Sequence, residues 1–372
     1  MTIASASNTK FDAALNKQLQ NIAKRRANLE NPLPSPQIAL SAPKLGIEFR
    51  STNANEPFHI ASIGKLITAS VILQLVGEEK LKLDSPITEL LPAADTELLF
   101  TIDGTDYASQ VTIDHLLSHT SGVADYFEGK VQGGLSFLEL VFHDTDRVWQ
   151  PAELLAFTRE YQSTIAKPGE RYVYSDTGYV LLGRIIEEAL GKSFHEVVHQ
   201  RIFDTLGMVN SYFPYRSVSA AEAASGISPV LQPLWVEGHE LSQKAALSID
   251  WAGGGIVSTL EELLVFSRAL HGGELFNKEL LSVMQEPRNT FHTGIVYGAG
   301  MMELRFGEFF FLLQGLPRLR GHLGVTGTHL FYDPVHDAHI AMNFHSTTEM
   351  PKSFRPLIIV EQLLAKQAKR LK

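Results

Sequence analysis

The stretch Ser62-Ile-Gly-Lys-Leu-Ile-Thr-Ala-Ser-Val-Ile-Leu-Gln-Leu-Val76 is the part of the chain that decides the fold. It predicts a helix that Ser62 opens and that closely spaced apolar residues fill. At a spacing of three residues, Ser62 and Lys65 lie on the same helix face and within reach of each other. A serine hydroxyl becomes a good nucleophile when a nearby base takes its proton, and the helix N-terminus favours a developing anion.

This serine–lysine spacing alone is a weak signal. Ser7-Asn-Thr-Lys10 and Ser41-Ala-Pro-Lys44 have it too, in a polar leader and in a strand broken by proline. For the isolated pattern, Ser62 as a helix cap with a solvated Lys65 is the better explanation. The rest of the chain has to decide between the two interpretations.

Outward from this helix, the pattern predicts a sheet between helices. An amphipathic helix is expected over 11–29, two strands over 37–50, and a mainly helical region with long loops from about 77 to 240. Further helices are expected at Gly178–Leu190, at Leu260–Leu270 with Thr259 as N-cap, and over 355–370. Strands are expected at Tyr297–Phe306, Glu308–Leu313, Gly327–Tyr332 and Ala338–Phe344.

These elements predict an α+β fold in which N- and C-terminal helices flank an antiparallel sheet. Residues 1–76 and 241–372 would form this lobe, and residues 77–240 a mainly helical lobe, with a cleft between the two.

Two more clusters carry residues suited to chemistry. Tyr174 and Asp176 lie in a loop just before the helix at 178–190, where a rigid scaffold can hold catalytic groups, although a core tyrosine beside an N-cap aspartate would look the same. Gly321-His-Leu-Gly324 is expected at the start of a strand, where glycine lets a substrate approach the backbone. A turn with an incidental histidine is the alternative.

Together the three clusters resemble the motif set of the serine β-lactamases and penicillin-binding proteins. The segments Phe58–Lys65, Leu116–Gly122, Tyr174–Gly183, Leu206–Met208 and Gly253–Thr259 are similar to the class C branch, which includes esterases and D-peptidases. The resemblance covers roughly residues 35–345 in the family's order.

The resemblance implies a role for each matching position. Ser62 would form an acyl-enzyme, and Lys65 and Tyr174 would move the proton, with either of them as the base. His322 stands where many relatives have lysine, and Leu323 and Gly324 would line the substrate. The backbone N–H groups of Ser62 and Val325 would form the oxyanion hole.

This sequence departs from the family pattern in two places. Asp176 replaces the usual asparagine, and a carboxylate there should raise the pKa of Lys65 and shift the work of the base to Tyr174. Alternatively, Ser175-Asp-Thr177 could match the Ser-Asp-Asn motif of other branches. Leu323 and Val325 replace hydroxyl residues that hold a substrate carboxylate in many relatives, which favours uncharged substrates.

Composition excludes several classes of function. A net charge of −9 disfavours nucleic acid as a partner, and the absence of cysteine excludes disulfides and thiolate chemistry. The histidines show no metal-ligand spacing, so neither a metal nor a cofactor is expected. The first ten residues lack a basic segment followed by an apolar run, and no stretch of 18 apolar residues exists, so we expect a cytoplasmic protein with no membrane contact.

The leading hypothesis is a serine hydrolase that acts on small esters or amides. A D-alanyl-D-alanine carboxypeptidase or D-aminopeptidase, and then a β-lactamase, are the alternatives within the enzyme class. A non-catalytic binding protein that keeps the penicillin-binding fold is the alternative of another class.

Overall fold

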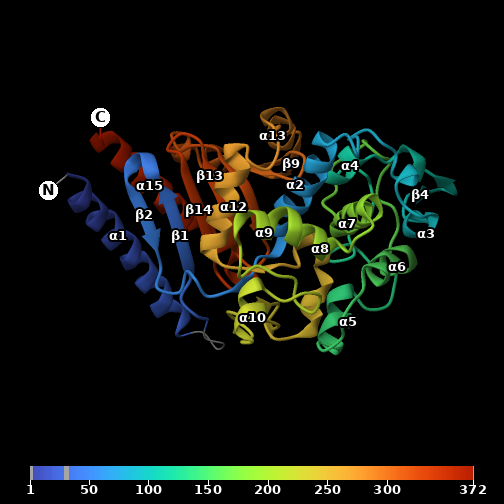
Figure 1. Cartoon of the computed structure of the whole chain (residues 1–372), viewed down its shortest axis with the longest axis horizontal. Coiled ribbons are helices and arrows are strands. Elements are labelled where there is room, and N and C mark those ends of the chain that lie inside the picture. The colour runs from blue at the N-terminus through green and yellow to red at the C-terminus, as the bar shows by residue number, and fades with distance from the viewer. Residues whose placement is uncertain (1–2, 29–32, 372) are drawn as a thin grey trace.

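The computed structural model describes residues 3–28 and 33–371, and its centre is an eight-stranded antiparallel sheet (Figure 1). The strand order is β2-β1-β14-β13-β12-β11-β10-β9, so the two ends of the chain meet where β1 pairs with β14. The strands are β1 (Gln37–Ala42), β2 (Ile47–Arg50), β9 (Asn289–His292), β10 (Ile295–Tyr297), β11 (Met302–Leu304), β12 (Leu319–Gly324), β13 (Thr328–Asp333) and β14 (Ala338–Asn343).

Both faces of this sheet are covered by helices. Because side chains alternate along a strand, Ile340 and Met342 point to one face and Ala341 to the other. The first face packs against α1 (Ile3–Arg26) and α15 (Met350–Leu371), and the second against α12 (Leu260–Gly272). Figure 1 shows α1 and α15 beside β1 and β2, far from the helical part of the molecule. The expected α+β class with terminal helices on the sheet is therefore confirmed.

The region between β2 and β9 is mainly helical. Short hairpins interrupt it at β4–β5 (Thr101–Ile102, Thr105–Asp106) and β6–β7 (Trp235–Val236, His239–Glu240), and β3 (Phe58–His59) pairs with β8 (Val257–Ser258). Its helices are α2 (Gly64–Gly77), α3 (Ala93–Thr96), α4 (Ile113–Leu117), α5 (Phe137–His143), α6 (Pro151–Tyr161), α7 (Asp176–Leu190), α8 (Phe194–Val198), α9 (Asp204–Leu206), α10 (Ala220–Ser225), α11 (Trp251–Gly254) and α13 (Lys278–Gln285). No helix among the described residues is long and apolar enough to cross a bilayer.

The helix predicted over 62–76 forms the junction between the sheet and the helical region. It begins with the short 3₁₀ turn η2 (Ala61–Ile63) and continues as α2, which packs against α7 and α11. A Cβ on Gly64 would lie 2.7 Å from Cα of Gly254, so glycine is needed for this close approach. The end of β12 also lies against η2, and the junction therefore brings β12, α2, α7 and α11 to one place.

Three local predictions need correction. The expected strand Glu308–Leu313 instead forms two helical turns, α14 (Phe306–Phe309) and η7 (Phe311–Leu313). Because β11 pairs directly with β12, the segment between them has no strand to bond with and makes local hydrogen bonds instead. The expected strand Tyr297–Phe306 is divided into β10 and β11, and the Gly321–Gly324 motif ends β12 rather than starting a strand.

Candidate active site

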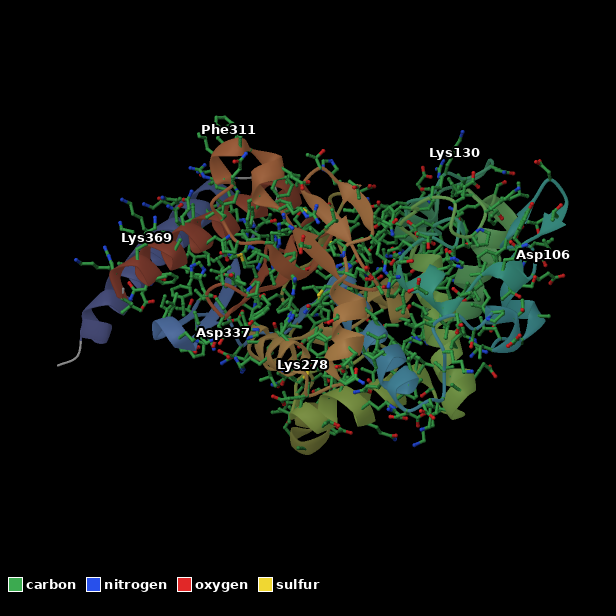
Figure 2. The ribbon with its side chains drawn as sticks, turned by 90° about the horizontal axis from the view of Figure 1, so that it is seen from above. Asp106, Lys130, Lys278, Phe311, Asp337 and Lys369 are labelled. Atoms are coloured by element: carbon green, nitrogen blue, oxygen red, sulfur yellow. The ribbon has the colours of Figure 1, made fainter. Side chains whose placement is uncertain are left out.

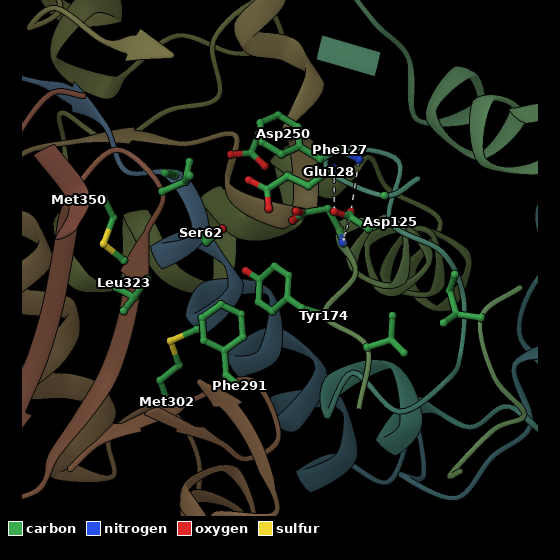
Figure 3. Close-up of a pocket in the computed structure, with 16 residues that line it drawn as sticks. Ser62, Asp125, Phe127, Glu128, Tyr174, Asp250, Phe291, Met302, Leu323 and Met350 are labelled. Carbon is green, nitrogen blue, oxygen red and sulfur yellow. Dashed lines mark hydrogen bonds between the residues drawn. The ribbon is translucent and has the colours of Figure 1, made fainter. Parts of the chain in front are cut away.

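Ser62 lies at the rim of the junction and lines a cavity of about 350 Å³ (Figure 3). The residue before it, Ala61, is buried and has a φ of +50°, an uncommon conformation for a residue with a Cβ. This backbone turn leaves Ser62 half-buried and open to the cavity, while the following residues of α2 from Gly64 to Leu73 are buried.

Lys65 makes three polar contacts in the site. Its side chain is fully buried, and Nζ donates to Oγ of Ser62 at 3.1 Å and to the carbonyl oxygen of Gly253 at 2.8 Å. The ammonium also forms an ion pair with Oδ1 of Asp176. Three elements, η2, α7 and α11, thus supply the contacts of one ammonium group, and the predicted proximity of Ser62 and Lys65 is confirmed.

The ion pair decides the charge of Lys65. Burial lowers the pKa of Lys65, but the carboxylates of Asp176 and Asp250 and the hydrogen bond to Asp176 raise it by more, so the net pKa is raised. This is the direction expected from aspartate at position 176. Lys65 is therefore an ammonium at rest, and its use as a base requires that it first lose a proton.

Tyr174 lies next to the same two residues. Nζ of Lys65 is 5.1 Å from the centroid of the Tyr174 ring, and the centroids of the Tyr174 and His119 rings are 4.2 Å apart. Burial first, and then the carboxylate of Asp176, raise the pKa of Tyr174 well above its usual value, against an opposing hydrogen bond with Ser62. The phenol is therefore protonated at rest and is placed to exchange a proton with the Ser62 hydroxyl.

His119 holds the loop that carries Tyr174. Its Nδ1 accepts a hydrogen bond from the backbone N–H of Ser175 at 3.1 Å, and its backbone oxygen accepts one from Val173 at 2.7 Å. Burial lowers the pKa of His119 well below its usual value, so the ring is neutral and can accept this bond. The sequence interpretation of His119 as a structural residue agrees with these contacts.

Two aspartates that the sequence analysis did not single out also belong to the site. Asp125 accepts a hydrogen bond from the backbone N–H of Asp176 at 2.9 Å, and Asp250 lies close to Lys65. Burial first, and then the carboxylate of Asp176, raise the pKa of each to about 7. Their only signal in the sequence is that they stand three residues after Leu116–Gly122 and three residues before Gly253–Thr259, two of the segments that carry the resemblance.

The end of β12 forms the opposite wall of the cavity. Leu323 and Val325 line it, and a Cβ on Gly324 would lie 2.7 Å from Cβ of Ala61, so glycine lets this strand approach the Ser62 turn. No described residue accepts a hydrogen bond from the N–H of Val325, which leaves that group available to a ligand. Its role in an oxyanion hole remains a prediction.

His322 lies behind this wall and does not line the cavity. Its Nδ1 donates to the carbonyl oxygen of Leu323 at 2.6 Å, and its Nε2 accepts from the hydroxyl of Tyr297 at 3.0 Å. Burial and the nearby charge of Lys65 lower the pKa of His322 to about 3, so the ring is neutral. Arg320 bonds to Gln285 and is likewise absent from the cavity lining, and a catalytic role of His322 remains a prediction.

The cavity wall combines apolar side chains with carboxylates (Figure 3). Among the described residues, no lysine or arginine lines it. The apolar members include Phe127, Ile165, Phe291, Met302, Leu323, Val325 and Met350, and the acidic members are Asp125, Glu128, Asp176 and Asp250. A substrate that enters meets Ser62 at the base of an apolar and acidic cavity.

A serine hydrogen-bonded to a lysine at a helix start, beside a tyrosine loop and the end of a sheet strand, is the arrangement found among β-lactamases and penicillin-binding proteins. The profile of the family described as Beta-lactamase matches residues 48–364. The chain therefore belongs to the β-lactamase family.

Known relatives differ in what their names state. Penicillin-binding protein 4 of Amycolatopsis lactamdurans is 30% identical over 48% of this chain, and the match spans only 43% of that protein. The D-amino acid amidase of Ochrobactrum anthropi SV3, solved with L-phenylalanine amide, has a TM-score of 0.72 at 23% identity, covering 95% of this chain and 99% of that one. EstCE1, a hydrolase with promiscuous acyltransferase activity, has a TM-score of 0.72 at 18% identity over the same shares. These structural likenesses establish the fold.

Restoring asparagine at position 176 should move the pH dependence of hydrolysis. Asp176→Asn removes the carboxylate that raises the pKa of Lys65, so the pH at which kcat/KM rises should fall by about one unit or more. The measurement is the pH profile of kcat/KM with p-nitrophenyl butyrate, and Asp84→Asn, at an exposed carboxylate, is the control. An unchanged rising limb in Asp176→Asn would show that this ion pair does not control the base.

Proposed function

We propose that this chain hydrolyses small esters or amides through an acyl-enzyme on Ser62. The observation that carries the proposal is the hydrogen bond from Nζ of Lys65 to Oγ of Ser62, in a cavity that Tyr174 also lines. A protein that only bound a ligand would not need a buried ammonium held against a serine hydroxyl.

The proposed reaction has two steps. After the Lys65–Tyr174 pair has lost one proton to solvent, Oγ of Ser62 bonds to the substrate carbonyl carbon while its own proton passes to that pair, and the leaving alcohol or amine departs with this proton. Water then attacks the acyl carbon, gives one proton back to Oγ and releases the acid. The backbone N–H groups of Ser62 and Val325 would hold the oxyanion, each contributing ~3 kcal/mol to the transition state.

The cavity lining supports uncharged acyl groups. The side chains of Leu323 and Val325 offer no hydrogen bond to a carboxylate, and no lysine or arginine among the described residues of the wall would hold one. In support, EstCE1 is described as a hydrolase with promiscuous acyltransferase activity and the Ochrobactrum protein as a D-amino acid amidase, and both share this fold. Carboxylate-bearing β-lactams are less well suited to this wall.

Amides with a free amino group are the second candidate class. Glu128 stands in the cavity wall near Asp125 and Asp176, where a substrate ammonium would find negative charge. Burial and then Asp176 raise the pKa of Glu128, and an ammonium beside it would favour the ionised form.

Hydrolysis should depend on Ser62. Mass spectrometry after a slow-turnover ester should show an acyl adduct on the peptide that contains Ser62, and Ser62→Ala should lose both the adduct and turnover. Ser41→Ala, at the serine of the other Ser-x-x-Lys match with described side chains, is the control and should keep both. An adduct elsewhere with active Ser62→Ala would end the proposal and favour the non-catalytic alternative for this cavity.

A comparison of substrates tests the preference for uncharged acyl groups. Relative to spontaneous hydrolysis, kcat/KM for p-nitrophenyl butyrate should exceed that for nitrocefin by about tenfold or more, because no charge-assisted bond holds the nitrocefin carboxylate. The double change Leu323→Thr with Val325→Ser should narrow this ratio. A higher relative kcat/KM for nitrocefin than for the ester would contradict this preference and make a β-lactamase the leading hypothesis.

The second class predicts a role for Glu128. Glu128→Gln should lower kcat/KM for phenylalanine amide by about threefold to tenfold and change the rate with p-nitrophenyl butyrate less, because only the amide carries an ammonium. Glu97→Gln, at an exposed carboxylate outside the cavity lining, is the control. Equal effects on both substrates would exclude recognition of the amino group by Glu128.

A further inference from the structure

A second group of polar residues lies at the far end of the sheet. Asp333 and His336 belong to the turn between β13 and β14, and Glu361 projects from the middle of α15. One ligand atom from each of the three lies within 4.8 Å of the others. Figure 2 shows the neighbouring Asp337 at the sheet end of the molecule, away from Asp106 and Lys130 in the helical part.

Glu361 has an unusual environment for a carboxylate. It is 0% exposed, and neither of its oxygens accepts a hydrogen bond from a described donor. Asp333 is also fully buried, and among the described residues its only ion-pair partner is His336. Burial first, and then Asp333, raise the pKa of Glu361 well above its usual value. Two buried carboxyl groups this close therefore either share a proton or bind a cation between them, because two unpaired buried charges are costly.

We propose that Asp333, His336 and Glu361 bind a divalent transition-metal cation, with zinc as the first choice. Two carboxylates and one imidazole match the ligands that such cations accept, and an imidazole disfavours magnesium and calcium. His336 is 8% exposed, so the site is close enough to the surface for a cation to enter and for water to complete its coordination.

The turn already holds two of the ligands in place. Oδ1 of Asp333 accepts hydrogen bonds from the backbone N–H groups of Val335 at 2.8 Å and His336 at 3.3 Å, and Oδ2 contacts Nδ1 of His336. The hydrogen bonds to Asp333 therefore orient it, while Glu361 reaches the turn from a separate helix. A cation here would fasten α15 to the β13–β14 hairpin.

The site is separate from the catalytic cavity. Oγ1 of Thr328, at the first residue of β13, donates to the carbonyl oxygen of Ile60 beside the Ser62 turn. Asp333 ends the same strand five residues later, about 17 Å away at ~3.4 Å per residue. The cation would therefore support the fold, and hydrolysis should not pass through it.

The test is zinc binding by the full chain after dialysis against EDTA, followed with a competing chromophoric chelator and elemental analysis. We expect one zinc per chain and a rise in Tm of about 3 °C or more at saturating zinc. His336→Ala and Glu361→Gln should each weaken binding at least tenfold, and Asp337→Asn, in the same turn, is the matched control. His336→Ala carries the test if Glu361→Gln does not fold.

Three results would overturn the proposal. They are zinc bound at well below one per chain, zinc binding that both variants retain, and a Glu361→Gln variant with a higher Tm than the unmodified chain when zinc changes the Tm of neither. The last result would mean that Glu361 is a neutral acid in the native protein. No substrate is needed for these measurements, so they are independent of the proposed hydrolysis.

Discussion

The buried ion pair between Lys65 and Asp176 is the interaction on which the site depends. An ammonium that is 0% exposed is stable only when its charge and its donors are satisfied, and Asp176, Gly253 and Ser62 do this together. The partners come from α7, α11 and η2, so the same contacts that neutralise Lys65 also fix the helices around Ser62. The contacts that stabilise the buried Lys65 ammonium are therefore the same contacts that position it beside Ser62.

This ion pair also determines the electrostatics of the cavity. Burial first, and then the Asp176 carboxylate that pairs with Lys65, raise the pKa of Asp125 and of Asp250 to about 7. The site thus holds protons that are loosely bound near neutral pH. Such groups can accept or supply a proton during acyl transfer without a change in the arrangement of Ser62 and Lys65.

The sequence predicted those features that depend on interactions between residues close together in the chain. The spacing of Ser62 and Lys65, the N-cap at Thr259 and the helix end at Gly191 follow from helix geometry and are present. The aromatic run Phe309–Phe311 has strand propensity, but strand formation needs a neighbour that the sheet order does not provide. Asp125 and Glu361 act through residues distant in sequence, at Asp176 and Asp333, so no spacing could have revealed them.

Two positions at which this chain differs from many relatives, 176 and 322, change the charge near Lys65 in the same direction. Asp176 stands where the family usually has asparagine, which adds one negative charge. His322 is neutral and stands where many relatives have lysine, which removes one positive charge. The site is therefore two charges more negative than the resemblance implies. The changes are compatible because His322 lies close enough to Lys65 for that ammonium to lower its pKa. A second cation at 322 would compete with Lys65 for the same carboxylate. A neutral ring bound to Tyr297 avoids this competition, and it leaves the β12 wall without the charge that an anionic substrate would require.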